Sequence, residues 1–214
     1  MATTYNAIIQ EDNASLQLLS QNGYNLQIAK GVSVRGGPSY SMVYSSQYLN
    51  SNTSVSWNTT YGLNWTTQES FPGMRVTLGG EWQQCDLGAS YNLNEYGGWD
   101  SNHNDPSAQK NCLNVGSNNF QTAVQIIIGV YDSSAGDWTP IWVDSDSLLK
   151  NSHGEYEPVE SIKLWFEEGD QTATIINQQG TASQEFDMTD SPQTYFSYDA
   201  EEGRWKTPQS TPFQ

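Results

Sequence analysis

The sequence predicts an all-β protein, built as an antiparallel β-sandwich or barrel with long irregular loops. Apolar and polar residues alternate along several segments of the 214-residue chain, as they do on the two faces of a strand. Turn residues separate these segments at short intervals, and no repeat of the length that propellers use is present. Eight Trp, twelve Tyr and six Phe supply the bulk that a chain poor in aliphatic residues needs for a core.

The clearest element is a hairpin over Gln121–Asp144. Apolar β-branched residues occupy alternate positions from Val124 to Val130, so they share one face of a strand. A polar turn with a glycine follows at residues 132–137, and apolar residues then resume up to Val143. We therefore expect an antiparallel sheet with this hairpin at its centre.

The N-terminal region predicts two strands, Tyr5–Gln10 and Tyr24–Val34. In the second, Leu26 and Ile28 alternate with polar residues, as a half-buried strand requires. The segment between the two strands, residues 12–19, fits either a short helix capped by Asp or Asn or another strand. Both alternatives stay open.

Past the break at Gly36-Gly37-Pro38, residues 39–48 predict a strand that carries Tyr40, Met42 and Tyr44 on one face. Val55–Thr67 is β-prone and aromatic. Met74–Trp82 alternates again, and its paired glycines, Gly79 and Gly80, indicate a bulge or a place where another backbone or a ligand comes close. The long region Gln83–Asn119 is rich in Asn, Ser and Gly, and we expect it to be irregular and to form one wall of a binding site.

The last third of the chain predicts a meander and a terminal hairpin. Ser161–Glu167, Thr172–Asn177 and Thr181–Met188 are separated by the turns 168–170 and 178–180. Tyr195–Tyr198 and Arg204–Lys206 then form a hairpin around residues 201–203. From about residue 207 the chain becomes a terminal strap, and residues 1–214 are expected to form a single β domain.

Charge and targeting signals limit the partners and the location. The chain has 8 Lys and Arg against 24 Asp and Glu, for a formal net charge of −16, and its basic residues do not cluster. Such a surface cannot neutralise a row of phosphates, so nucleic acid and anionic membranes are expected not to be partners. No signal peptide or transmembrane segment is recognised, so we expect a cytoplasmic protein in which Cys85 and Cys112 are reduced thiols. A homodimer is one alternative for its oligomeric state.

The sequence favours a protein without catalytic activity. It contains none of the motifs GxSxG, HExxH, CxxC or GxGxxG, and the P-loop spacing near Gly31 lacks the Lys that contacts phosphate. Its two histidines, His103 and His153, lie in polar loops, where a base for a nucleophile is not expected. A glycosidase pair among the 24 acids is defined by separation in space, which the sequence does not supply.

Aromatic residues give the strongest indication of a site. Flat rings flanked by Asn, Asp and Thr can stack on a sugar or on a planar organic ligand, although the same rings also serve as the core of a sandwich poor in aliphatic residues. The predicted ligand-binding residues are Trp57, Tyr61, Trp65, Trp82, Trp99, Asn102 and His103.

A calcium site is the second candidate. Asp100, Asn102 and Asn104 stand at alternate positions, which is how a calcium-binding loop begins. The pattern then departs from that of an EF-hand, because Asp105 stands where glycine is needed and Asn111 where a bidentate Glu is needed. A calcium site of another type and a solvated Asn-rich loop are the two interpretations.

An acidic β protein with stretches such as SVSWNTTYGLNWTT resembles the abundant cytosolic fruit-body proteins of mushrooms, among them lectins and the pink chromoprotein of the oyster mushrooms. The resemblance is one of composition and assigns no site residue. It implies non-enzymatic binding of a ligand, which is a glycan in the lectins and a bound organic chromophore in the chromoprotein. We therefore expect a small-ligand-binding, chromoprotein-like function at an aromatic-lined site. The alternatives are a carbohydrate-binding lectin, a pore-forming or toxin-like β protein, and an enzyme of unrecognised type.

Overall fold

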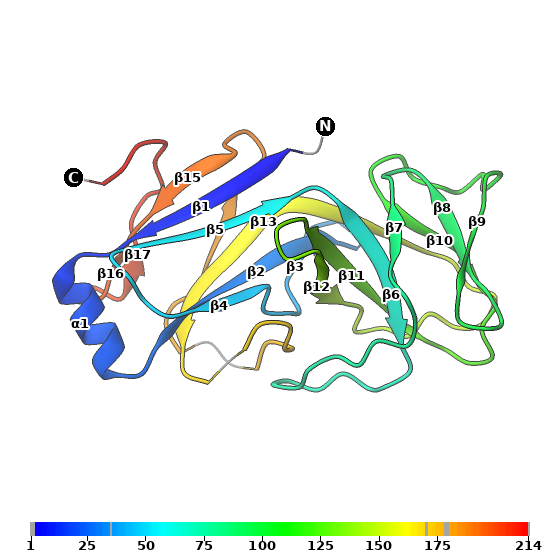
Figure 1. Cartoon of the computed structure of the whole chain (residues 1–214), viewed down its shortest axis with the longest axis horizontal. Coiled ribbons are helices and arrows are strands. Elements are labelled where there is room, and N and C mark those ends of the chain that lie inside the picture. Colours follow the sequence, from blue (N-terminus) through cyan, green and yellow to red (C-terminus); the bar gives the residue numbers. More distant parts are fainter. Residues whose placement is uncertain (1–2, 35, 170, 178–179, 214) are drawn as a thin grey trace.

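The computed structural model of the protein describes residues 3–34, 36–169, 171–177 and 180–213. In these residues the chain forms β-sheets and one short helix, which confirms the all-β prediction (Figure 1). Most strand pairs are antiparallel, although β1 pairs with β15, and β10 with β8, in parallel. The described strands do not close into a barrel. No helix in the described part of the chain has the length and apolar character needed to cross a membrane.

The largest sheet is organised around the long strand β13. Its order is β3-β2-β13-β10-β8-β9, with β14 also paired to β13 and β4 to β2. The first residues of β13 pair with β10 and its later residues pair with β2 and β14, so one strand serves both parts of the sheet. Its strands are β2 (Asn25–Ser33), β3 (Pro38–Ser39), β4 (Ser45–Gln47), β8 (Ser90–Leu93), β9 (Trp99–Ser101), β10 (Leu113–Asn118), β13 (Gly154–Glu167) and β14 (Gln184–Asp187).

Smaller sheets pack against this one. A second sheet has the order β12-β11-β6-β7 and a third the order β15-β1-β5, while β16 pairs with β17. Their strands are β1 (Thr4–Gln10), β5 (Asn52–Asn58), β6 (Tyr61–Thr66), β7 (Gln83–Cys85), β11 (Gln125–Asp132), β12 (Asp137–Val143), β15 (Gln193–Phe196), β16 (Tyr198–Asp199) and β17 (Arg204–Trp205).

The apolar rows predicted from alternation form the core between the sheets. On β11, Ile126, Ile128 and Val130 face the main hydrophobic cluster, to which Leu26 and Ile28 of β2 also belong. The intervening residues of β11 point the other way, where Ile127 packs with Met42, Val143 and Ile175 in a second cluster. Both faces of the β12-β11-β6-β7 sheet are therefore covered near Ile127, which explains why β11 reads as an almost continuous apolar run.

The segment for which the sequence allowed either a helix or a strand, residues 12–19, forms the start of helix α1 (Asn13–Gln21), whose N-cap is Asp12. The Asp12 side chain accepts a hydrogen bond from the backbone N of Ser15 at 2.8 Å, which satisfies one of the free amides of the first turn. The residue before it, Glu11, is only 5% exposed, and its Oε1 accepts a hydrogen bond from the backbone N of Tyr198 at 3.0 Å. Glu11 thus joins the end of β1 to the β16–β17 pair near the C-terminus.

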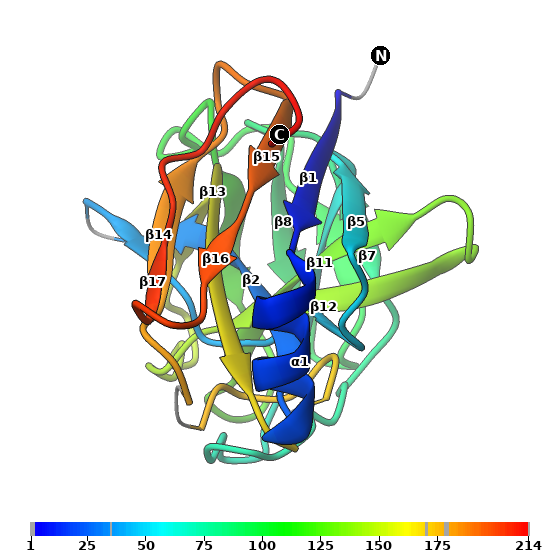
Figure 2. The same ribbon diagram turned by 90° about the vertical axis from the view of Figure 1, so that its left-hand side faces the viewer.

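The hairpin predicted over Gln121–Asp144 is confirmed as β11 and β12. Its expected central position is wrong, because β12 is the edge strand of its sheet and β11 pairs on its other side with β6. Figure 2 shows the hairpin extending away from the body of the sheets. Its turn, residues 132–137, is therefore free to form the rim of a surface site.

Three predicted strands are wrong. Residues 39–48 form the short strands β3 and β4 with an irregular segment between them, and Tyr40, Met42 and Tyr44 pack into three different clusters. Met74–Trp82 forms no strand, although Arg75 makes an isolated bridge with Thr174. The second strand of the predicted meander is also wrong, because Thr172–Asn177 makes only isolated bridges, whereas the third contains β14. Alternation predicts a strand only where a partner edge is available.

Other segments contain more regular structure than the sequence indicated. Val55–Thr67 lies in the strands β5 and β6, joined by a short turn at Thr59 and Thr60. Gln83–Asn119 is not irregular, because it contains the strands β7 to β10 separated by turns rich in Asn and Gly. The expectation of a single long loop was wrong because these strands are too short to show a period.

The C-terminal part keeps its predicted hairpin in shorter form. β16 pairs with β17 around the predicted turn, whereas Tyr195 belongs to β15, which pairs with β1. Beyond residue 207, Gln209 bridges to Tyr195, and the backbone N of Phe213 donates a hydrogen bond to Oε1 of Gln10 at 2.7 Å. The predicted turns at 168–170 and 178–180 include Asp170, Gln178 and Gln179, which lie outside the described residues.

Candidate functional site

Two of the predicted ligand-binding residues, Trp57 and Tyr61, converge on a single carboxylate inside the protein. The indole Nε1 of Trp57 donates a hydrogen bond to Oε2 of Glu160 at 3.0 Å, and the hydroxyl of Tyr61 donates to Oε1 at 2.5 Å. Trp57 lies at the end of β5, Tyr61 at the start of β6, and Glu160 where β13 changes its register. The β5–β6 turn therefore brings both donors to one acceptor.

A fully buried lysine completes this cluster. Nζ of Lys30 lies 3.3 Å from Oε2 of Glu160 and 4.3 Å from the centroid of the Trp57 ring. Burial lowers the pKa of Lys30 to about 8, although the carboxylate of Glu160 opposes this shift. Burial, reinforced by the same carboxylate, raises the pKa of Tyr61 well above its ordinary value. The group is thus a closed network of paired polar atoms.

This network leaves Trp57 little surface for stacking on a ligand. Tyr5 stacks against the indole with ring centroids 5.8 Å apart and an angle of 10° between the planes, and Lys30 Nζ lies over the ring. Tyr44 meets it edge-on at 6.4 Å. The side chain of Trp57 is 3% exposed, so only part of its rim can meet a bound molecule. Trp57 and Tyr61, which are 3% and 2% exposed, therefore offer almost no open ring face for stacking on a ligand.

Trp65 is held by backbone and belongs to the core. A Cβ added at Gly79 would lie 2.6 Å from ring atoms of Trp65, and one at Gly80 would lie 2.9 Å from its Nε1. Nε1 donates to the carbonyl oxygen of Gly97 at 3.0 Å, and the Phe120 ring packs at 4.6 Å between centroids. The backbone approach predicted for the paired glycines is found at Gly80, where the carbonyl oxygen of Gly97 would lie 2.9 Å from an added Cβ, whereas the group close to Gly79 is the Trp65 side chain. With 5% of its side chain exposed, Trp65 presents almost no surface to a ligand.

Trp82 forms an aromatic row with two residues of the β11–β12 hairpin. Its ring stacks on Trp138 with centroids 5.4 Å apart and planes at 18°, and Tyr131 packs against Trp138 at 5.2 Å. All three side chains are partly buried. A Cβ at Gly129 would lie 2.5 Å from the outer edge of Trp82, so the indole occupies the space that a side chain on β11 would fill.

The remaining predicted residues lie on and after β9. Trp99 is partly buried, while Asp100, His103 and Asn104 are exposed. Nδ2 of Asn102 donates to Oδ1 of Asn92 at 3.4 Å, and Oδ1 of Asp100 accepts from Asn94 at 3.3 Å.

These contacts bear on the calcium prediction without testing it. Polar groups of the proposed ligands Asp100 and Asn102 are bonded to neighbouring side chains, as in a solvated loop. In the described residues, no three His, Cys, Asp or Glu side chains are grouped closely enough to hold a metal ion. Cys85, which is buried, and Cys112, which is partly exposed, are both free thiols.

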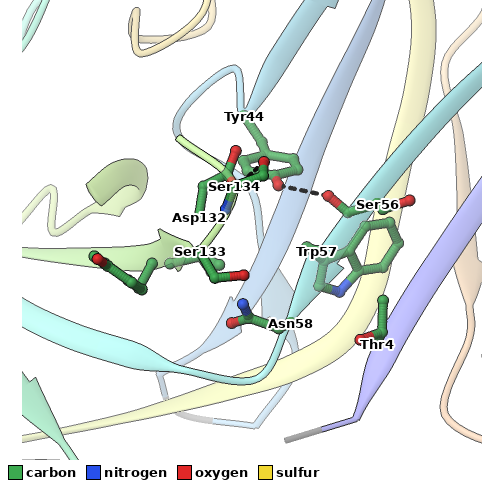
Figure 3. A pocket seen from close by; sticks show the side chains of 10 residues that line it. Thr4, Tyr44, Ser56, Trp57, Asn58, Asp132, Ser133 and Ser134 are labelled. Carbon is green, nitrogen blue, oxygen red and sulfur yellow. Dashed lines mark hydrogen bonds between the residues drawn. The ribbon is translucent and has the colours of Figure 1, made fainter. Parts of the chain in front are cut away.

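A surface hollow of about 230 Å³ lies between β5 and the β11–β12 turn (Figure 3). Three aromatic rings, those of Tyr44, Trp57 and Tyr131, contribute to its wall. Its polar residues come from the N-terminus, from β5 and from the turn. The described residues that line it are Thr4, Tyr44, Ser56, Trp57, Asn58, Val130, Tyr131, Asp132, Ser133 and Ser134.

Several polar groups in this wall are available to a ligand. Oδ1 of Asn58 accepts from the backbone N of Thr60 at 2.9 Å, and no partner in the described residues uses its Nδ2 donors. The hydroxyl of Tyr44 donates to the carbonyl oxygen of Ser56 at 3.1 Å, which fixes the position of this ring (Figure 3). Aromatic carbon surface and the unused amide donors of Asn58 therefore face the same small space.

Of the predicted ligand-binding residues, only Trp57 belongs to the described lining of this hollow. The sequence did not indicate any of the other lining residues as part of a site. The turn at residues 132–137 was recognised as a turn, but nothing in it indicated a site. Lys30 carried a usable signal, because it stands in phase with the inward residues Leu26, Ile28 and Val32 of β2. A charged residue in such a row predicts a buried partner of opposite charge.

No protein-family model, no curated protein and no solved structure matches this chain.

Proposed function

We propose that this protein binds a small saccharide unit in the hollow between β5 and the β11–β12 turn, without transforming it. The observation that carries the proposal is the composition of the wall, in which the rings of Tyr44 and Tyr131 and the exposed rim of Trp57 lie with Asn58 and the serines of the turn. A sugar ring presents apolar C–H faces and a belt of hydroxyl groups. Aromatic surface supports binding of the C–H faces, and amide, hydroxyl and carboxylate groups support binding of the sugar hydroxyls.

Size favours a sugar over a large pigment. At about 230 Å³ the hollow is smaller than the roughly 300 to 1,000 Å³ of pockets that hold drug-sized molecules. The rings expected to hold a planar chromophore also belong to the core, since Trp57 and Trp65 are each no more than 5% exposed. The lectin alternative therefore fits this site better than the chromoprotein alternative does.

Binding without catalysis is supported by the side chains at the site. The wall contains the carboxylate of Asp132 but no histidine, cysteine or lysine. A glycosidase would need a second carboxyl group across the bond to be cleaved, and the lining does not contain one.

The test is titration calorimetry with a panel of monosaccharides, on the protein and on Asn58→Ser. Serine can still accept the hydrogen bond from Thr60 N, but it lacks the amide donors of Asn58. We expect the affinity for the sugars that bind to fall about fivefold or more, as the loss of one hydrogen bond predicts. Asn111→Ala, at an exposed position outside the hollow, is the control and should bind as the parent does. Absence of binding to every sugar, or equal affinity for both variants, would exclude this site.

A further inference from the structure

The carboxylate of Asp132 is the charged group of the hollow, and its two oxygens differ. Oδ1 accepts hydrogen bonds from Ser134 N at 2.8 Å, from Ser134 Oγ at 2.6 Å and from Ala135 N at 3.2 Å. These donors, the Ser134 hydroxyl first, lower the pKa of Asp132, so the group is ionised at neutral pH. Oδ2 has no hydrogen-bond partner in the described residues. The turn thus fixes the carboxylate and leaves one oxygen for a ligand.

The surroundings of this oxygen favour a positive charge. Among the described residues of the lining there is no Lys, Arg or His that could neutralise Asp132. Lys30 lies against Trp57, but it is fully buried and paired with Glu160, so the pair adds little net charge. The charge of Asp132 also reaches the Tyr44 phenol, because after burial it is the second cause that raises the pKa of Tyr44 to about 12. The formal charge of −16 on the whole chain attracts cations to the same surface.

Aromatic rings beside the carboxylate add a second attraction for a cation. An ammonium group near the face of a tyrosine ring is stabilised by the ring's quadrupole, most strongly where water is excluded. Tyr44 and Tyr131 both line the hollow that Asp132 lines. A neutral sugar would use the hydroxyl and amide groups but not the combination of the Asp132 carboxylate with the tyrosine rings. An acidic sugar would be repelled by the carboxylate.

We infer that the ligand is an amino sugar whose unsubstituted ammonium group sits against Oδ2 of Asp132 and the neighbouring tyrosine rings. This inference rests on the proposed function, because it names the class of saccharide that the same hollow takes. The ammonium group donates to the free carboxylate oxygen, while the ring hydroxyls bind Asn58 and the serines of the turn. N-acetylation of the sugar removes the charge and enlarges the group, so it should weaken binding.

The experiment compares glucosamine, N-acetylglucosamine, glucose and choline by titration calorimetry at low salt and at a pH at which the amine of glucosamine is protonated. Asp132→Asn is the informative variant, because the asparagine oxygen can still accept the three bonds that hold the turn while the charge is lost. Asp137→Asn is the matched control, since it removes one charge from the exposed end of the same hairpin, outside the hollow. We expect the parent protein to bind glucosamine about tenfold more tightly than either neutral sugar.

Each result separates the two proposals. A preference for glucosamine that is lost in Asp132→Asn and kept in Asp137→Asn supports the inference. Equal affinity for all three sugars, or a preference that survives in Asp132→Asn, overturns the inference and leaves the saccharide site standing. Failure of every sugar to bind overturns the proposed function itself. Choline binding as tightly as glucosamine would also overturn the proposed function, because the sugar hydroxyls would then contribute nothing to binding.

Discussion

Replacement of Glu11 by glutamine should flatten the dependence of stability on pH. Glu11 is 5% exposed, and burial raises its pKa from 4.5 to about 8 against the opposing hydrogen bond from Tyr198 N. The nearby charges of Asp12 and Asp199 add to the rise, and Lys206 opposes it. The buried Oε2 makes no hydrogen bond, so neither ionisation state is fully compensated.

The sign follows from proton binding. Between pH 4.5 and about 8 the folded protein keeps the Glu11 proton that the unfolded chain has already lost. The contribution of Glu11 to stability is therefore present at low pH and is lost as the pH rises through this interval, by about 1.4 kcal/mol for each pH unit. Over the whole interval the loss amounts to about 5 kcal/mol, which is comparable with the total stability of many domains.

The assay is urea unfolding followed by tryptophan fluorescence at several pH values between 5 and 8. Glutamine keeps the acceptor for Tyr198 N and cannot ionise, so the slope of the unfolding free energy against pH should fall by about 1.4 kcal/mol per unit relative to the parent. Glu201→Gln, at an exposed position in the β16–β17 turn, is the control for the loss of one charge. Parallel slopes for the parent and Glu11→Gln would refute the assignment of a buried, protonated carboxyl.

Three further predictions follow from packing and pairing. Glu160→Gln should lower the free energy of unfolding by about 3 to 5 kcal/mol, because it leaves the fully buried Lys30 without its charged partner. Glu185→Gln, which breaks the more exposed pair with Lys163, should change the free energy of unfolding by less than about 1 kcal/mol. Equal effects of the two substitutions would contradict this account. Gly79→Ala should cost about 1 to 3 kcal/mol in thermal unfolding, because its Cβ would meet the Trp65 ring at 2.6 Å, while Gly37→Ala meets nothing within 4 Å and should be close to neutral. With a thiol reagent, Cys112 should react in the folded protein, and Cys85, whose pKa burial raises to about 12, should react only after denaturation; prompt reaction of both would show that Cys85 is not enclosed.

Sequence patterns predicted the longer strands well and the short ones poorly. β1, β2, β11 and β12 were found because each is long enough to show an alternating apolar row, although β2 and β11 are buried on both faces, so the half-buried strand expected over Tyr24–Val34 is wrong; of β13 only the part from Ser161 on was predicted. Met74–Trp82 has the same alternation but makes only isolated backbone contacts, such as the Arg75–Thr174 bridge and the hydrogen bond from Gly79 N to Trp65 O at 2.7 Å, so it forms no ladder. Whether a partner edge is present depends on the tertiary structure, which local periodicity does not report.

The candidate site was beyond sequence reasoning for a related reason. Its wall comes from Thr4, Tyr44, residues 56–58 and residues 130–134, which are distant along the chain. None of these segments carries a motif by itself. Aromatic residues drew attention to Trp57 and Trp65, but in a core poor in aliphatic residues the largest rings are needed inside, so abundance of Trp indicated packing more than it indicated a site.

The position of the hairpin turn affects how ligand choice could change in this protein. Residues 133–137 are exposed at the tip of the β11–β12 hairpin, and the core contacts of β11 lie further down the strand. Asp132 and the two serines can therefore be exchanged, or the turn lengthened, without disturbing the packed rows that stabilise the sheets. A library randomised at these few positions would sample new binding specificities on an unchanged scaffold, and natural variation could do the same at little cost in stability.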